Sequence, residues 1–342
     1  MKYLNRSILF ISILSIFGCA KDDTYITLKV HHFLPPKSTA HAKFIVPWCN
    51  QIAQKSSGTM QCQIYPAMQL GGSPAQLFDQ VKDGVVDIVW TVPGYSAGRF
   101  PSIEAFELPF MMKTPMASSK ALWDYVNNNA MEEFSDVHLL ATHVHGPGFF
   151  HMKSRPILNL EDLNGMKIRA PTRITNQLIA ELGATPVGMP VPSVPEALAK
   201  GVIDGALVPY EIVPAIKANE LTEFHSETPS DSPAIYTTTF IYAMNVNKYK
   251  SLSPEHRAII DNASGLILSG EIGKIFAEGD KTGKSTVSKE SINVITTKEL
   301  EKWYPVAEIV RSQWIEEMNA SGKDGNYLLN SAEELTRKYD DE

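Results

Sequence analysis

Cysteine, excess positive charge and long apolar runs are all scarce in this sequence of 342 residues. Its three cysteines form no Cys-x-x-Cys pair, which excludes a zinc site built on such pairs. Acidic residues outnumber Lys and Arg by 38 to 31, and a formal net charge of −7 argues against sequence-independent binding of nucleic acid. Only the run Ile8 to Phe17 is long and apolar, so no later segment is expected to span a bilayer.

Motifs for cofactor chemistry are absent as well. The sequence shows no P-loop, no G-x-G-x-x-G after a predicted strand and no carboxylate pair at a recognisable catalytic spacing. We therefore expect a protein that binds a ligand, uses no cofactor or metal and is not an enzyme.

Two weak patterns favour other readings. Gly94-Tyr95-Ser96-Ala97-Gly98 fits the G-x-S-x-G of a hydrolase, which would make Ser96 the nucleophile of a secreted esterase. That motif needs a helix directly after the serine, and Pro101 and Pro109 favour a loop there. The pairs His31-His32 and His143/His145 would supply metal ligands if their strands met, although strand histidines more often pack or hydrogen-bond.

The N-terminus is typical of an exported protein. Lys2 and Arg6 precede a short apolar core, which ends at Gly18-Cys19 and is followed at once by polar residues. This order predicts a lipoprotein signal over residues 1–18, acylation of Cys19, and a periplasmic protein held to a membrane by its lipid. The alternative is ordinary secretion with cleavage nearby.

Export permits a disulfide between the two remaining cysteines. Cys49 lies late in a predicted helix and Cys62 early in the strand that follows, so the two elements are expected to be neighbours. Two buried free thiols are the alternative.

The body of the chain has the composition and order of an α/β protein. Its 44% apolar and 20% charged residues are typical of a globular protein long enough for two or three domains. Predicted strands alternate with helices from residue 26 onward, which favours an α/β layer architecture.

An internal echo indicates two similarly built lobes. Residues 84–93 read GVVDIVWTVP and residues 201–210 read GVIDGALVPY, each following an amphipathic helix that ends on glycine. Chance similarity between two βαβ units is the alternative. The predicted division is residues 26–147 with about 233–262 for lobe I, 148–232 with about 263–310 for lobe II, and 311–342 as C-terminal helices. A long helix is expected from Pro254 toward Lys284.

Arg169 is the first candidate for ligand binding. It ends the predicted strand MKIRAP, at the strand edge where open α/β sheets gather ligands, and a guanidinium there can bind a carboxylate through two hydrogen bonds. A surface salt bridge is the alternative, and the nearby Arg173 is expected to be solvated. The other predicted strand ends are apolar and would form the wall of a pocket; they are Phe33, Trp90, Phe149, Phe150, Val208, Tyr210 and Phe240.

The block GMKIRAPTRITNQLIAELGATPVGMPVPSVPEALAKGVIDGALVP resembles the signature of TRAP-transporter substrate-binding proteins, the DctP family, and the likeness runs from about Thr27 to Trp303. The resemblance implies two α/β lobes with a hinge and a long helix spanning both. It also implies that an organic acid binds in the cleft, that Arg169 grips its carboxylate, and that the acid is delivered to the membrane permease.

Two departures from the family pattern narrow the expected ligand. Many members have a second arginine where this chain reads Gly148-Phe149-Phe150-His151, and an asparagine where it has Val208. A second carboxylate facing these residues would be desolvated without a partner. We therefore expect a monocarboxylate with an apolar or aromatic tail, or a small 2-oxo or 2-hydroxy acid, with His151 as a polar contact. A ligand-sensing lipoprotein that serves a signalling partner is the alternative to uptake.

Overall fold

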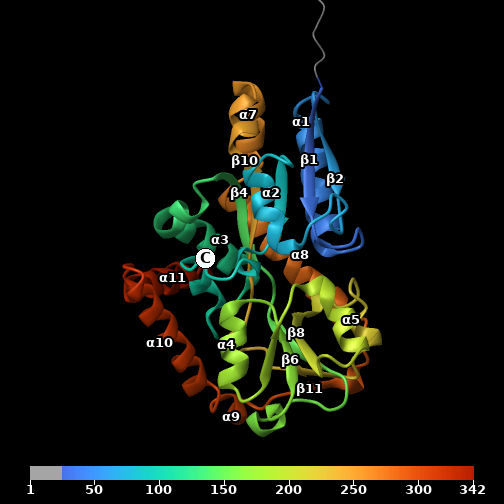
Figure 1. The fold of residues 1–342 in the computed structure, drawn as a ribbon, viewed down its shortest axis with the longest axis vertical. Helices are drawn as coiled ribbons and strands as arrows, with labels where there is room; N and C mark the ends of the chain where they lie inside the picture. Colours follow the sequence, from blue (N-terminus) through green and yellow to red (C-terminus); the bar gives the residue numbers. More distant parts are fainter. Residues whose placement is uncertain (1–24) are drawn as a thin grey trace, which may run out of the picture.

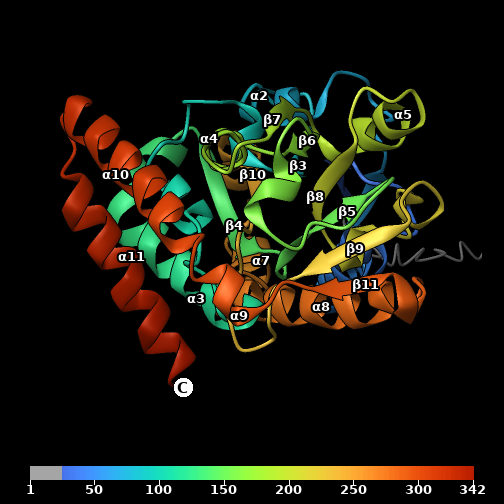
Figure 2. The same ribbon diagram turned by 90° about the horizontal axis from the view of Figure 1, so that it is seen from below.

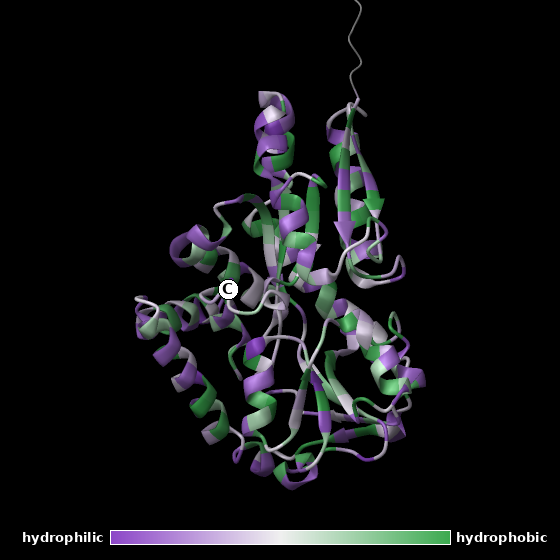
Figure 3. Cartoon of the chain, in the orientation of Figure 1, coloured by the Kyte–Doolittle hydropathy of each residue, from purple (hydrophilic) through white to green (hydrophobic). Residues whose placement is uncertain are grey.

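The computed structural model describes residues 25–342, so the predicted signal and Cys19 lie outside the described residues. Two β-sheets, each covered by helices, form two lobes that lie one above the other in Figure 1. In Figure 3 the strands carry much of the hydrophobic colour, and hydrophilic residues are prominent on the outer helices. Within residues 25–342, no helix combines the length and the apolar character needed to cross a membrane.

The first lobe is built on a five-stranded sheet. Its central strand β3 pairs in parallel with β1 and antiparallel with β10, a strand that returns from much later in the chain as the sequence predicts. In spatial order the strands are β2 (Met60–Tyr65), β1 (Ile26–His32), β3 (Ile88–Thr91), β10 (Thr239–Asn245) and β4 (Val137–Val144).

The second lobe is built on a six-stranded sheet with a similar core. Here β8 pairs in parallel with β6 and antiparallel with β5. In spatial order the strands are β11 (Ile292–Val294), β9 (Phe224–Glu227), β5 (Gly148–Met152), β8 (Gly205–Pro209), β6 (Lys167–Ala170) and β7 (Thr185–Gly188).

The sequence echo corresponds to a repeated backbone arrangement. Just before β3, the Asp87 carboxylate accepts a hydrogen bond from the Lys29 main-chain N–H at 2.8 Å. Just before β8, the Asp204 carboxylate accepts one from the Lys167 N–H, also at 2.8 Å. Each aspartate thus bonds a main-chain N–H of the neighbouring parallel strand, so the two echo segments occupy equivalent places in their sheets.

Helices begin and end at the residue types that the sequence offers for this purpose. Ser73 and Gln76 form a reciprocal capping box over a 3₁₀ turn that leads into α2, and the Ser253 hydroxyl accepts from the His256 N–H at 3.1 Å to start α7. The helices are α1 (Val46–Lys55), α2 (Leu77–Lys82), α3 (Pro115–Tyr125), α4 (Arg173–Glu181), α5 (Val194–Ala199), α6 (Val246–Ser251), α7 (Pro254–Asn262), α8 (Leu266–Lys284), α9 (Thr297–Leu300), α10 (Tyr304–Ala320) and α11 (Gly325–Asp340).

Helix α8 is the element that spans both lobes. The prediction of one helix from Pro254 is wrong in its start, because Gly265 adopts φ +84° and separates α7 from α8. A Cβ at Gly273 would lie 2.4 Å from the Pro115 carbonyl oxygen in α3, and one at Gly283 would lie 1.9 Å from the Tyr210 carbonyl oxygen in the second lobe. Glycine therefore lets the helix lie directly against the backbone of each lobe.

Two further features complete the fold. A disulfide joins Cys49 in α1 to Cys62 in β2, with their Cα atoms 5.6 Å apart, so these cysteines are not free thiols. The C-terminal helices α10 and α11 lie along one side of the molecule, where they contact α4 and α3 respectively (Figure 2). The predicted residue boundaries of the lobes stay a prediction.

Candidate ligand-binding site between the lobes

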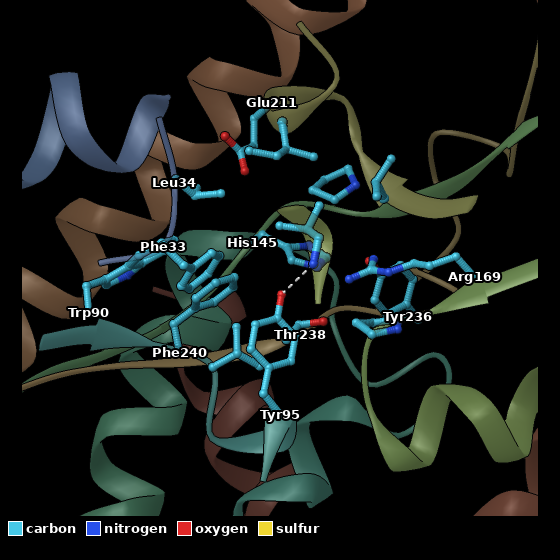
Figure 4. A pocket seen from close by; sticks show the side chains of 16 residues that line it. Phe33, Leu34, Trp90, Tyr95, His145, Arg169, Glu211, Tyr236, Thr238 and Phe240 are labelled. Atoms are coloured by element: carbon cyan, nitrogen blue, oxygen red, sulfur yellow. Dashed lines mark hydrogen bonds between the residues drawn. The ribbon is translucent and has the colours of Figure 1, made fainter. Parts of the chain in front are cut away.

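A cavity of about 360 Å³, counting all space between its lining atoms, lies between the two sheets. Both lobes contribute to the wall, with rings from the first lobe and Arg169 from the second (Figure 4). Of the predicted residues, five line it: Phe33, Trp90, Arg169, Val208 and Phe240.

Arg169 is buried at the carboxyl end of β6, with 2% of its surface exposed. Its Nε donates to the Met189 carbonyl oxygen at 3.0 Å and its Nη1 to the Leu207 carbonyl oxygen at 2.9 Å. The alternative of a surface salt bridge is therefore wrong. These two main-chain carbonyls use part of the five-donor guanidinium and hold it in one orientation toward the cavity.

The first lobe supplies a stack of aromatic rings. The Trp90 ring lies between Phe33, at a centroid distance of 4.9 Å, and Phe240, at 4.8 Å, and both pairs are nearly parallel. Trp90 Nε1 donates to His143 Nε2 at 2.8 Å, which satisfies the indole in the core. These contacts give the cavity a flat, rigid apolar wall suited to a flat apolar group.

Several polar residues that line the cavity were not among the predicted ligand contacts. The Tyr95 hydroxyl accepts from the Val191 N–H at 3.2 Å and is a hydrogen-bonding neighbour of Arg169. Burial lowers the pKa of His145 to about 3, so its ring is neutral, and Nδ1 donates to the Gly146 carbonyl oxygen at 2.5 Å. Additional lining residues include Leu34, Glu211, Tyr236 and Thr238.

The sequence held a signal for some of these residues. Tyr95 belongs to the G-x-S-x-G pattern, but that pattern predicts a role for the serine and none for the tyrosine before it. Tyr236 and Thr238 lie in the polar, aromatic segment that precedes β10, where the chain passes between the lobes.

Four predicted contacts lie outside the cavity wall, which corrects their expected placement. Phe150 is fully buried against Trp303, with ring centroids 5.9 Å apart, and Phe149 packs on Tyr210 at 5.6 Å. His151 Nδ1 lies 2.7 Å from His225 Nδ1. Because side chains alternate along β5, Phe149 and His151 lie on one face of the second sheet and Phe150 on the other, and their ring contacts are with residues that do not line the cavity.

Arg173 is not solvated, contrary to expectation. Its guanidinium forms ion pairs with Glu104 of the first lobe and Glu317 of α10, and its side chain is 24% exposed. Glu104 is nearly buried, so the pair joins the first turn of α4 to the opposite lobe. Nearby, Glu107 accepts from the Thr239 N–H at 3.0 Å.

The two weaker patterns do not assemble a site. The Ser96 hydroxyl donates to the Ala75 carbonyl oxygen at 3.1 Å, and the chain continues from it through turns to the 3₁₀ helix Ile103–Glu107. Within residues 25–342, no group of three or more His, Cys, Asp or Glu side chains is placed to hold a metal ion.

Comparison with known proteins places this arrangement in one family. A family model described as bacterial extracellular solute-binding protein, family 7 (DctP), matches residues 30–317. A TRAP solute-binding protein from Rhodoferax ferrireducens T118, solved with copurified benzoate, is 48% identical and has a TM-score of 0.91, covering 92% of this chain and 99% of that one.

Two other similar proteins agree with this placement. A marine metagenome TRAP solute-binding protein specific for aromatic acid ligands, solved with 3-hydroxybenzoate, is 44% identical with a TM-score of 0.89, covering 93% of this chain and 99% of that one. The ectoine-binding periplasmic protein TeaA of Halomonas elongata is 24% identical over 278 residues, which are 78% of each chain. These proteins are binding proteins rather than enzymes. The chain thus belongs to the extracellular solute-binding proteins of family 7, the DctP family of TRAP transporters.

Proposed function

We propose that this protein binds an aromatic monocarboxylate between its lobes and delivers it to a TRAP permease in the membrane. The observation that carries the proposal is a buried guanidinium, Arg169, which faces a cavity walled by stacked rings. A buried charge is stable only with a partner, and within residues 25–342 Arg169 hydrogen-bonds neutral groups, namely the Met189 and Leu207 carbonyls and the Tyr95 hydroxyl. A ligand carboxylate supplies the missing negative charge.

The aromatic wall supports a ring as the remainder of the ligand. Phe33 and Phe240 stack on Trp90, and the three rings form an apolar wall on which a ligand ring can pack in offset or edge-to-face contact. The solved relatives bound to benzoate and 3-hydroxybenzoate support the same ligand class for this chain. A second carboxylate would meet Val208 and other apolar groups with no cation opposite it.

Calorimetric titration with a panel of acids tests this function. The panel contains benzoate, cyclohexanecarboxylate, lactate, pyruvate and succinate, each added to protein freed of copurified ligand by partial unfolding and refolding. We expect benzoate to bind most tightly. Micromolar binding of succinate without binding of benzoate would overturn the proposal.

The partner and the anchor are part of the same proposal. Acylation at Cys19 would hold the protein at a membrane, where it meets the permease subunits. In cells, C19S should move from the membrane fraction to the soluble periplasmic fraction. A ligand-sensing role would use the same two lobes, and neighbouring genes for a permease or for a sensor kinase distinguish uptake from sensing.

A further inference from the structure

Glu211 is a buried carboxyl at the edge of the cavity, in the 3₁₀ turn Tyr210–Ile212 that follows β8. Its main-chain N–H donates to Asp280 Oδ1 of α8 at 2.9 Å. A Cβ at Gly279 would lie 3.0 Å from Glu211 Cβ and 2.9 Å from Thr39 Oγ1, so α8 lies directly against both side chains. The position of Glu211 is therefore fixed by the helix that spans the lobes.

The Glu211 carboxyl is not fully used by the protein. The Thr39 hydroxyl lies near it, but Oε2 is buried and has no hydrogen-bond partner within residues 25–342. Burial, with a smaller effect from the Asp280 carboxylate, raises the pKa of Glu211 to about 8. A neutral carboxyl both donates and accepts hydrogen bonds, and leaving a buried one unpaired is unfavourable.

Glu211 and Arg169 enter the same cavity from different sides (Figure 4). We propose that Glu211 is a specificity-determining residue that hydrogen-bonds a hydroxyl group on the ring of the acid whose carboxylate pairs with Arg169. This inference rests on the proposed function and narrows it to hydroxylated aromatic acids.

A hydroxyl fits this position better than the other common ring substituents. It can donate to Glu211 Oε2 or accept from the protonated carboxyl, so it pairs with either protonation state. A methyl group of similar size would bury Oε2 unpaired, and sites built for a hydroxyl reject analogues that lack it. A second carboxylate would add negative charge beside Glu211 and Asp280.

Matched ligand pairs test the proposal on the unmodified protein. Dissociation constants are measured by calorimetry for benzoate and for the hydroxyl and methyl derivatives at each ring position. For at least one position, we expect the hydroxyl compound to bind roughly tenfold more tightly than its methyl counterpart. A ratio below about three at every position overturns the proposal, whether or not any variant folds.

Two variants and one control assign the preference to Glu211. E211Q keeps a hydrogen-bonding group and should retain most of the ratio, whereas E211L should reduce it to about one. E278Q removes an exposed carboxylate that lines only the outer groove beside α8, and should leave the ratio unchanged. A ratio that survives in folded E211L overturns the assignment.

Failure of this inference is distinct from failure of the proposed function. If benzoate binds but no hydroxyl preference exists, only the role of Glu211 falls. If no aromatic acid binds at all, the proposed function falls and this inference with it.

Discussion

Strand β1 of the first lobe and strand β6 of the second occupy equivalent places beside β3 and β8. His31 pairs with Val89 in the first sheet, and Arg169 pairs with Ala206 at the same register in the second. His31 Nδ1 bonds Gln80 of its own lobe at 2.7 Å, whereas Arg169 faces the cavity. The same backbone arrangement therefore carries a histidine bonded within its own lobe in one case and an arginine that lines the cavity in the other.

At the next position along β3 and β8 it is the first lobe whose side chain lines the cavity. Trp90 of β3 presents its ring to the cavity, while its counterpart in β8, Leu207, contributes its carbonyl oxygen to Arg169. Under the proposed function, the first lobe would contact the ring of the ligand with its aromatic side chains, and the second would bind the carboxylate through Arg169. A ligand that satisfies both must touch both lobes, which links binding to closure.

The sharpest way to break this comparison is to remove the anchor. R169A should weaken benzoate binding by about 2–5 kcal/mol, because the ligand carboxylate would be buried without a charged partner. H31N replaces the equivalent residue of the first lobe and keeps a donor toward Gln80, so it should bind benzoate with unchanged affinity. Calorimetry measures the benzoate affinity of both variants. Equal losses of affinity would show that the two equivalent positions do not differ in their role.

The next prediction concerns how the stability of the protein depends on pH. The two buried carboxyls Glu211 and Asp280 lie in the second lobe and in α8. Burial raises the pKa of Asp280 to about 7 and that of Glu211 to about 8. In the folded state these two carboxyls therefore keep protons that they release in the unfolded chain above their ordinary pKa values, 3.8 for Asp280 and 4.5 for Glu211. This contribution to stability is present at low pH and is lost as the pH rises from about 5 to 8.

E211Q removes the larger part of that dependence. The difference in unfolding free energy between E211Q and the unmodified protein should change by roughly 3 kcal/mol across this range. Taking the difference cancels the opposite effect of buried histidines such as His143, whose pKa is lowered to about 3. Urea denaturation at pH 5, 6, 7 and 8 measures it, and parallel curves would contradict the raised pKa of Glu211.

The positions of strands β3 and β8, and of Arg169 at a strand end, could be predicted from the sequence because their signals are local. A glycine, an aspartate and a buried run mark both β3 and β8, and the strand before Pro171 places Arg169 at its end. The family resemblance supplied the two lobes. The disulfide followed from the expected closeness of a helix and a strand that are consecutive in the chain.

Side-chain contacts between distant parts of the chain could not be predicted in this way. Arg173 meets Glu104 and Glu317, which lie 69 and 144 positions away. The direction in which the Phe150 side chain points depends on how β5 packs against its neighbours. The sequence alone does not distinguish an apolar residue of the core from one that lines a pocket. Glu211 gives no sequence signal, because a carboxyl after a strand is most often solvated.

The repeated frame itself can be tested with two matched substitutions. D87N and D204N each weaken the bond to a lysine main-chain N–H, and each should lower the unfolding free energy by about 1–2 kcal/mol. D87N should cost slightly more, because Asp87 also lies 3.9 Å from the Lys248 ammonium. Chemical denaturation measures both values, and benzoate affinity should stay unchanged. A large effect in one lobe only would mean that the echo is not an equivalent structural feature.

The smallest expected effect sharpens the role of the first lobe. F33L removes a ring that stacks on Trp90 and contacts Tyr95 edge-on at 5.6 Å, while leaving an apolar side chain in the wall. Benzoate should lose about 1 kcal/mol, or roughly fivefold in affinity, and cyclohexanecarboxylate less, since only the aromatic ligand gains from ring-to-ring contact. F78L alters a ring of the same lobe that packs on Phe100 away from the cavity, and should weaken neither acid. If F33L loses the same affinity for both acids, Phe33 contributes only apolar surface and does not favour an aromatic ligand. A preference for an aromatic ring would then have to come from the second lobe.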